Sequence, residues 1–222
     1  TFRGRYFFSE FFPNLPSYSR FVELKSKIII PLCLFSYWMK GVCDDVSFVD
    51  STYLKVCHIK RMSNHKVFKD VARIGKSSMG WFYGFKLHLM VSSKGEILNF
   101  CITPGHENDR VPVEKLCQNL WGKVFGDKGY ISIDLFKKIF FERGVQIITP
   151  LKKKMKPQIL LQEDSRHLSK RSRIECVFNV LKNSLKIDHT RHRSIKNFMV
   201  NIISGICAYG MRFANPKLKV CS

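Results

Sequence analysis

Two aspartates in apolar surroundings are the residues of this chain best suited to chemistry. Asp127 ends a short apolar run and is flanked by glycines in the stretch Phe125-Gly126-Asp127-Lys128-Gly129. A carboxylate at the carboxyl end of a buried strand lies where α/β sheets commonly place their chemistry. The same pattern also fits an aspartate that caps a turn, because Asp and Gly are common turn residues. Asp50 stands in the middle of the β-rich run 44–57, where an ionised carboxylate is costly unless a cation or hydrogen-bond donors compensate it.

A third carboxylate, Glu175, lies on a predicted amphipathic helix. Arg171 is one turn before Glu175 and Lys182 is two turns after it, so the three charged side chains are expected to project from nearly the same side. The apolar face of this helix consists of Ile174, Val177, Phe178 and Leu181. The sequence therefore predicts a helix that packs on a core while it presents an acid and two cations together.

The order of the predicted elements favours an α/β fold with one main core. In such a sheet the Asp50 strand and the strand before Asp127 would lie side by side, and the late helix would bring Glu175 over them. Clustered carboxylates without a strong His or Cys ligand suit Mg²⁺ or Mn²⁺, which prefer oxygen. Two such ions would stabilise the attacking and leaving oxygens of an in-line displacement at phosphorus.

The remaining elements follow from periodicity and turn residues. His88 is interpreted as a packing or hydrogen-bonding histidine, and Asp109 or Asn108 as a helix cap. The stretch 60–76 is interpreted as a basic loop. The predictions are two helices around a turn at 13–16, a hairpin over 81–103 with its turn at 92–96, helices over 113–120, 131–143 and 195–213, and a strand over 145–150.

The charge of the chain indicates a polyanionic partner. Of the 222 residues, 38 are Lys or Arg and 17 are Asp or Glu, which gives a net charge of +21. Between residues 152 and 196 there are 13 Lys or Arg against four acids. Such a surplus favours binding to nucleic acid, where cations hold phosphates without reading bases.

The cysteines and the apolar runs indicate where in the cell the protein is expected. Eight cysteines are scattered without a CxxC pair, which disfavours a structural zinc site and indicates free thiols in a reducing cytoplasm. The longest apolar run, 28–38, contains Pro31 and is about half as long as the roughly 20 residues that a membrane helix needs. No membrane partner is expected. The chain opens at Thr1 without a methionine, which we interpret as the absence of an upstream portion.

Several motifs together resemble bacterial insertion-sequence transposases of the DDE class. They are the Asp50 strand, the hairpin strand Gly80-Trp81-Phe82-Tyr83-Gly84-Phe85-Lys86-Leu87-His88, the turn from Pro104-Gly105 to Asp109-Arg110, the stretch 125–130, and 189–194. The resemblance implies a ribonuclease H-like mixed sheet flanked by helices, with a short helical N-terminal segment. The expected division is a helical segment over 1–43, a catalytic domain over 44–213 and a tail over 214–222.

The resemblance also implies roles for individual residues. Asp50, Asp127 and Glu175 would be the catalytic residues and would bind two Mg²⁺ ions, with Mn²⁺ as a substitute. Many relatives carry a Tyr-x2-Arg-x3-Glu-x6-Lys pattern, of which Arg171, Glu175 and Lys182 match the last three members, while Leu168 replaces the tyrosine. The residues expected to contact DNA are Arg171, Lys182, Lys128, Arg173, Arg191 and Arg193.

The implied reaction is metal-dependent nicking of DNA at the ends of an insertion sequence. Strand transfer follows when the freed 3′-hydroxyl attacks target DNA. The partners would be element ends, target DNA and at least one further copy of the chain, in the bacterial cytoplasm at the nucleoid. Two alternatives remain open from the residues: a ribonuclease H-like nuclease that cuts without joining, and a catalytically inactive transposase remnant that only binds DNA.

Overall fold

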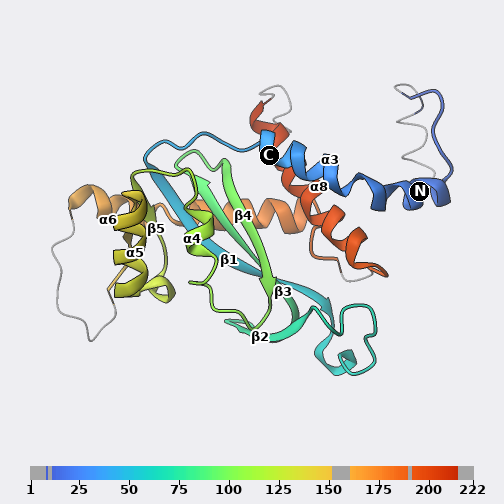
Figure 1. Ribbon diagram of the computed structural model, residues 1–222, viewed down its shortest axis with the longest axis horizontal. Helices are drawn as coiled ribbons and strands as arrows, with labels where there is room; N and C mark the ends of the chain where they lie inside the picture. The colour runs from blue at the N-terminus through green and yellow to red at the C-terminus, as the bar shows by residue number, and fades with distance from the viewer. Residues whose placement is uncertain (1–8, 10–11, 152–160, 190–191, 215–222) are drawn as a thin grey trace.

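The computed structural model describes residues 9, 12–151, 161–189 and 192–214. Its centre is a six-stranded sheet in which β1 lies between β3 and β5 and pairs with both (Figure 1). The strands are β1 (Val46–Cys57), β2 (Arg73–Ser77), β3 (Gly80–Ser92), β4 (Ile97–Pro104), β5 (Lys123–Phe125) and β6 (Gln146–Ile148).

The sheet is mixed, with the order β2-β3-β1-β5-β6 and with β4 paired to β3. Strands β1, β2 and β4 each pair antiparallel with β3. Strand β5 pairs parallel with β1 on one side and with β6 on the other. A meander followed by parallel strands brings the end of β5 beside the middle of β1. The mixed sheet flanked by helices confirms the predicted fold class and agrees with the ribonuclease H-like architecture.

The two faces of the sheet are covered by different helices, because successive residues of a strand face opposite sides. Phe48 and Leu54 of β1 belong to a core cluster with α7 and α8, and Val49 belongs to a second cluster with α4 and α5. The α-helices are α2 (Tyr18–Lys25), α3 (Ile29–Trp38), α4 (Val113–Leu116), α5 (Ile133–Arg143), α6 (Gln162–Ser169), α7 (Ser172–Asn179) and α8 (Ile195–Ala214). The described residues also form the 3-10 turns η1 (Ser26–Ile28), η2 (Ile59–Arg61) and η3 (Lys128–Tyr130) and the π-helical turn η4 (Val180–Ser184).

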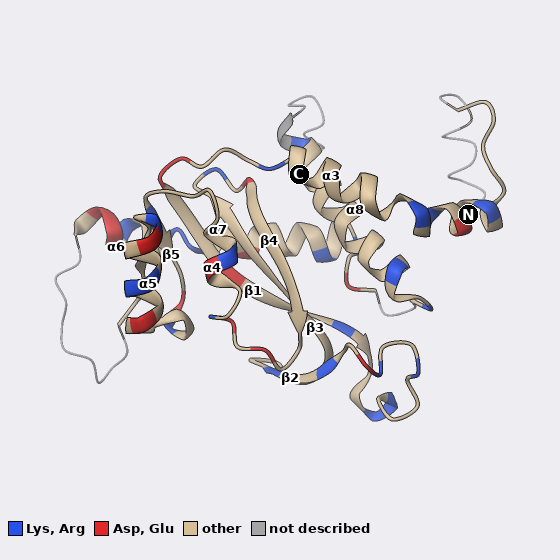
Figure 2. Ribbon diagram, in the orientation of Figure 1, with Lys and Arg blue, Asp and Glu red and all other residues tan. Residues whose placement is uncertain are grey.

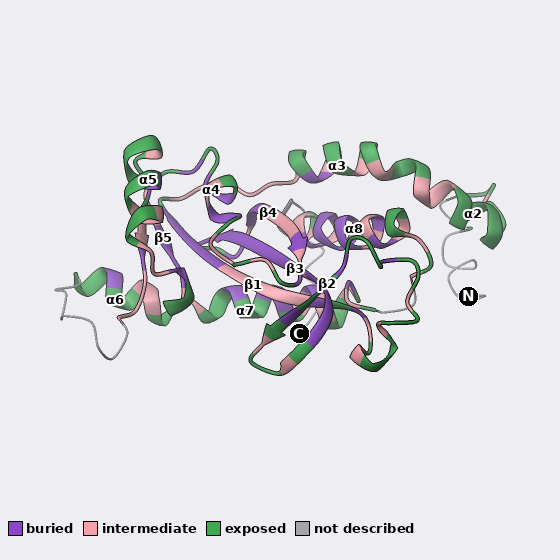
Figure 3. Cartoon of the chain, turned by 60° about the horizontal axis from the view of Figure 1, so that its bottom comes forward, coloured by how far each residue is buried: buried purple, intermediate pink, exposed green. Residues whose placement is uncertain are grey.

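Helix α3 lies along α8, and its outer side is exposed (Figure 3). The Cys207 thiol of α8 reaches the carbonyl oxygen of Leu32 at 3.8 Å. The helix predicted before the turn at 13–16 falls mostly outside the described residues. Among the helices that the structure describes, none is long and apolar enough to cross a membrane.

Two sequence predictions about local structure are wrong. The stretch interpreted as a basic loop contains β2, which pairs antiparallel with the first half of β3. The helix predicted over 113–120 is the single turn α4, and no side chain caps it. Asn108 instead accepts a hydrogen bond from the Arg110 amide, and Asp109 pairs with Lys86. The pairing of β2 with β3 is not visible in local sequence.

Candidate active site

The register between β1 and β5 places Asp50 beside Asp127. Phe48 of β1 is paired with Phe125 of β5, and each aspartate follows its phenylalanine by two residues. Because strand residues two apart face the same side, both carboxylates are directed to the face covered by α7 and α8. Strand β5 pairs with β1 only over residues 46–48 of β1, so the edge of β1 next to Asp50 is not covered by β5.

The glycines around Asp127 are required by close contacts. The Asp127 carboxylate accepts a hydrogen bond of 2.6 Å from the Gly129 amide and caps the turn η3. A Cβ on Gly129 would lie only 2.8 Å from Oδ1 of Asp127, and a Cβ on Gly126 would lie 3.0 Å from the ring of Tyr130. Asp127 therefore caps a turn, as one interpretation predicted, and also lies beside Asp50, as the other required.

The surroundings of Asp50 disfavour its ionised form. Its side chain is 23% exposed, and the Ser51 amide donates a hydrogen bond of 2.8 Å to its Oδ1. Burial raises the pKa of Asp50 to about 6, and the negative charges of Asp127 and Glu175 raise it further, while the Ser51 amide and Arg171 oppose the rise. The three carboxylates thus interact electrostatically at one place, although they come from three separate elements.

Helix α7 brings Glu175 and Arg171 over the two aspartates. Buried side chains on the opposite side of α7, Ile174, Val177 and Phe178, fix it on the core. Nη1 of Arg171 lies 3.8 Å from Oδ2 of Asp50, and Nη2 lies 3.9 Å from Oε1 of Glu175, which is 61% exposed. The guanidinium of Arg171 therefore lies between the carboxylates of Asp50 and Glu175. Figure 2 shows α7 behind the sheet.

The donor set at this place suits a hard divalent cation. Asp50, Asp127 and Glu175 offer only carboxylate oxygens, the ligands that Mg²⁺ and Mn²⁺ prefer. A cation would also offset the burial and repulsion that raise the pKa of Asp50. Within the described part of the chain, no three His, Cys, Asp or Glu side chains are disposed as a ready metal site. The Arg171 guanidinium supplies the positive charge between the carboxylates instead.

Lys182 lies differently from the sequence prediction. The helix is α-helical only to Asn179, and the turn η4 that follows is π-helical, with the Leu185 amide bonded to the Val180 carbonyl at 3.0 Å. The seven residues from Glu175 to Lys182 therefore do not form two regular α-helical turns. Nζ of Lys182 lies 4.1 Å above the ring of Tyr53, on the uncovered part of β1, and burial lowers the pKa of Lys182.

The sequence analysis did not single out Tyr53. Its ring lies near Lys55 as well as Lys182, at 5.1 Å from the Lys55 Nζ. An aromatic residue between two lysines is a surface suited to a nucleic-acid strand. The only local signal was its position three residues after Asp50 in the same strand.

The other residues expected to contact DNA are distributed more widely. Lys128 is exposed in η3, directly after Asp127. Arg173 is exposed on α7 and leans toward the β3–β4 turn, where a Cβ on Gly95 would lie 3.8 Å from its Cγ. Arg193 is exposed just before α8, and Arg191 lies outside the described residues.

A polar cluster lies behind Asp50 on the other face of the sheet. His88 is buried, its Nε2 lies 2.7 Å from Thr103 Oγ1, and its Nδ1 lies 3.9 Å from Asp109. Burial lowers the pKa of His88 to about 4, so it is a neutral, hydrogen-bonded residue as predicted. The Tyr130 hydroxyl is buried nearby, and burial followed by the charges of Asp50, Asp109 and Asp127 raises its pKa.

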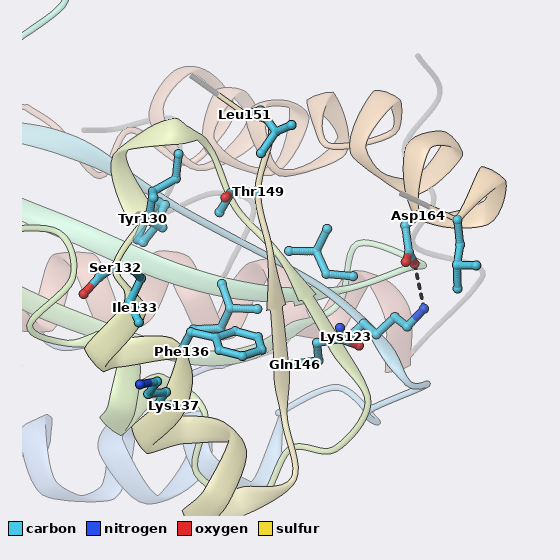
Figure 4. A pocket seen from close by; sticks show the side chains of 14 residues that line it. Lys123, Tyr130, Ser132, Ile133, Phe136, Lys137, Gln146, Thr149, Leu151 and Asp164 are labelled. Carbon is cyan, nitrogen blue, oxygen red and sulfur yellow. Dashed lines mark hydrogen bonds and ion pairs between the residues drawn. The ribbon is translucent and has the colours of Figure 1, made fainter. Parts of the chain in front are cut away.

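A hollow of about 520 Å³ lies between α5, β6 and α6. Figure 4 shows its lining, in which the ion pair between Lys123 and Asp164, at 2.7 Å, closes one side. None of the three carboxylates lines this hollow, but Tyr130 does. It is therefore a neighbour of the Asp127 turn and separate from the place where the carboxylates meet.

Residues 40–195 match the sequence model of the transposase DDE domain family, which covers more than half of the chain. The chain belongs to the transposase DDE domain family. Transposases of this family bind DNA, carry out cleavage and transfer of DNA strands, and in general use divalent metal ions. No curated protein and no solved structure matches the chain. The matched residues include Asp50, Asp127 and Glu175, and exclude α2, α3 and most of α8.

Proposed function

We propose that this DDE transposase cleaves DNA at the ends of a bacterial insertion sequence and transfers the freed strands to target DNA. Asp50, Asp127 and Glu175 are the proposed catalytic residues, and they hold two Mg²⁺ ions, or Mn²⁺ in their place. Such ions activate the attacking oxygen and stabilise the leaving oxygen. In the first step water attacks phosphorus and a 3′-oxygen leaves. In the second step the freed 3′-hydroxyl attacks a target phosphodiester, and the 3′-oxygen of the target strand leaves.

One observation carries the proposal. Strands β1 and β5 are adjacent and parallel, and Asp50 and Asp127 each follow a residue of the pair Phe48–Phe125 by two positions. Asp50 also interacts electrostatically with both Asp127 and Glu175. Two buried or half-buried aspartates and a glutamate would repel one another without a cation. A stable fold that gathers them beside an uncovered strand edge is better suited to binding a metal and a phosphodiester than to packing.

Cations around the carboxylates are the proposed DNA contacts. Arg171 already touches Asp50 and Glu175, so it can exchange these partners for a phosphate near the reacting bond. Lys182 over Tyr53 would hold the strand along the uncovered part of β1. Lys128, Arg173, Arg191 and Arg193 would add phosphate contacts farther away. These contacts contribute affinity that falls with salt and carry no base preference of their own.

The proposal extends to assembly, domains and location. One chain provides one set of three carboxylates, and an element has two ends, so we infer a homodimer or a larger complex in the active state. The catalytic domain would cover residues 44–213, with a helical segment over 1–43 and a tail over 214–222. The site of action would be the nucleoid in the bacterial cytoplasm.

Cleavage of labelled element-end DNA tests the proposal. The protein is incubated with Mg²⁺ or Mn²⁺ and a duplex that carries the end of its element, with and without a supercoiled target plasmid. Wild type should nick the end and join it to the plasmid, and Asp127→Asn should lower both rates at least a hundredfold. The matched control is Asp70→Asn, an exposed aspartate in the loop before β2, which should leave both rates within twofold.

Each other outcome supports a different function. Nicking without joining, abolished by Asp127→Asn, would make the protein a nuclease of the same fold. DNA binding without any nicking in either metal would make it a catalytically inactive DNA-binding remnant. Equal rates for wild type and Asp127→Asn would refute the assignment of the site.

A further inference from the structure

A second hollow, of about 410 Å³, lies between β2, the start of β3 and the turn after β4. We call it the Trp81 hollow, and the lining residues that matter are Trp81, Lys76, Lys86, Glu107, Asn108 and Asp109. Strand β2 lies at the lower edge of the sheet in the view of Figure 1. None of the motifs assigned to catalysis uses this hollow.

The main feature of the hollow is an exposed aromatic ring next to a lysine. Trp81 is 63% exposed, although it lies in a strand whose following residues are buried. Lys76 is its register partner on β2, and the Lys76 Nζ lies 5.6 Å from the centre of the indole ring. An exposed indole beside a cation can stack a nucleobase and hold the adjoining phosphate.

The floor of the hollow is backbone. A Cβ on Gly75 would lie 2.1 Å from the carbonyl oxygen of Gly105, and a Cβ on Gly105 would lie 2.6 Å from that of Arg73. The Gly105 amide also donates a hydrogen bond of 2.9 Å to the Gly84 carbonyl. The two glycines thus let the turn after β4 pack directly against the backbone of β2, and Trp81 and Lys76 are among the large side chains that line the hollow.

The wall of the hollow is rigid and carries groups that can pair with a base edge. Lys86 Nζ donates to the Glu107 carbonyl at 2.8 Å and to the Asp109 carboxylate at 3.0 Å, which ties the turn to β3. Two lysines face two acids, so the hollow is close to neutral and is not built for a phosphate alone. The carboxylate of Glu107 and the amide of Asn108 can accept from and donate to the polar edge of a base.

The Trp81 hollow is connected to the catalytic carboxylates. Asp109 lines the hollow. After burial, the charge of Asp109 is one of the causes that raise the pKa of Tyr130, together with the charges of Asp50 and Asp127. The neighbouring Arg110 donates a hydrogen bond of 2.8 Å from Nε to the carbonyl of Gly129, in the turn that Asp127 caps. The turn that lines the hollow is thus hydrogen-bonded to the turn that Asp127 caps.

We propose that the Trp81 hollow binds one unpaired nucleotide of the DNA substrate, with the base stacked on Trp81 and the adjoining phosphate on Lys76. This inference rests on the proposed function for its DNA substrate. The hollow admits a base only when it is out of the double helix, because a paired base has no free face. It therefore selects DNA that carries a single-stranded stretch near the reacting bond.

Tryptophan fluorescence tests the proposal directly. The chain has three tryptophans, and the double variant Trp38→Phe, Trp121→Phe leaves Trp81 alone. A ten-nucleotide single-stranded DNA should quench Trp81 and shield it from acrylamide, whereas a blunt duplex of the same sequence should bind without quenching. Unchanged Trp81 fluorescence at saturating single-stranded DNA would overturn the proposal.

Affinity measurements supply a matched comparison between two exposed tryptophans. Trp81→Ala should weaken binding of labelled single-stranded DNA by roughly 5- to 100-fold, the effect of losing one base–aromatic stack, and Trp81→Phe should restore most of it. Trp121→Ala, at a residue 57% exposed near β5, should change binding less than twofold. Equal losses for Trp81→Ala and Trp121→Ala would overturn the proposal.

A catalytic variant separates this inference from the proposed function. Asp127→Asn in the Trp81-only background should still show quenching by single-stranded DNA, because Asp127 does not line the hollow. Quenching with no cleavage by the wild type would refute the proposed function and leave the hollow intact. Cleavage by the wild type with no quenching would do the reverse.

Discussion

The raised pKa of Asp50 predicts that neutralising this residue stabilises the protein at neutral pH. Its pKa rises from 3.8 to about 6, mainly through burial. At about 1.36 kcal/mol per pKa unit, the rise of roughly two units corresponds to about 3 kcal/mol. The side chain is only 23% exposed, so solvent screening reduces this value modestly.

The sign follows from proton linkage. The folded state binds the proton of Asp50 more tightly than the unfolded state, so this group contributes most to stability below pH 3.8. That contribution is lost as the pH rises through about 6, when Asp50 must ionise inside the fold. Asp50→Asn has no such proton. Between pH 4 and pH 7.5 its free energy of unfolding should therefore rise relative to that of wild type by about 2 kcal/mol.

Urea denaturation of the two proteins across this pH range measures the effect. All other carboxylates are common to both proteins, so the difference between them isolates Asp50 to first order. Saturating Mg²⁺ at pH 7.5 should stabilise wild type more than Asp50→Asn, because only wild type presents the ionised ligand. The matched control, Asp70→Asn, should show a difference from wild type that is nearly independent of pH. The reasoning is refuted if the Asp50→Asn difference is flat or falls as the pH rises.

Three further predictions concern the residues around Asp50 and one helix end. Arg171→Gln removes a positive charge from between two carboxylates and should tighten Mn²⁺ binding at pH 8 by roughly fivefold or more, as measured by the electron paramagnetic resonance of free Mn²⁺. Lys182→Gln should weaken DNA binding and reduce the slope of log affinity against log salt by about 1, as measured by fluorescence anisotropy. Gly144→Ala should lower stability by about 1 kcal/mol and the melting temperature by roughly 2 to 4 °C, because Gly144 ends α5 at φ +68°.

Each of these has a control in the same chain. Arg173→Gln removes a neighbouring arginine that leans toward Gly95, and should leave Mn²⁺ affinity unchanged. Lys60→Gln removes an exposed lysine of η2 and should affect DNA binding less than Lys182→Gln. Gly144→Asn should cost less than Gly144→Ala, because asparagine tolerates the left-handed conformation. Equal effects within any of the three pairs would contradict the corresponding prediction.

Local sequence was sufficient for most of the strands and for the end of α5. The apolar alternation of β3 and β4 around a Gly95 turn, and the Gly144 that ends α5, carry their own signals and were predicted close to their observed bounds. Strand β2 was missed because its basic sequence gains its structure only by pairing with β3. Helix α4 begins at Val113 as predicted but ends at Leu116, and Asp109 forms an ion pair with Lys86 and does not cap the helix.

The change from α-helix to π-helix after Asn179 was also invisible in sequence. A seven-residue spacing between Glu175 and Lys182 gives the same prediction for any regular α-helix. Lys182 lies in this π-helical turn, and its Nζ lies over the ring of Tyr53, a residue of a strand more than a hundred positions earlier. Helix type at that point depends on packing against the sheet and cannot be read from the helix alone.

The sequence by itself determined which residues carry the charge and which strands and helices present them: Asp50 in a strand, Asp127 after one, Glu175 on an amphipathic helix, and an excess of cations. The tertiary structure decided what these groups experience. The register of β1 with β5 sets Asp50 beside Asp127, and the packing of α7 sets Arg171 between Asp50 and Glu175. Burial, charge repulsion and the approach of a cation depend on distances between separate elements, so the raised pKa of Asp50 and the Trp81 hollow arise only when the chain is folded.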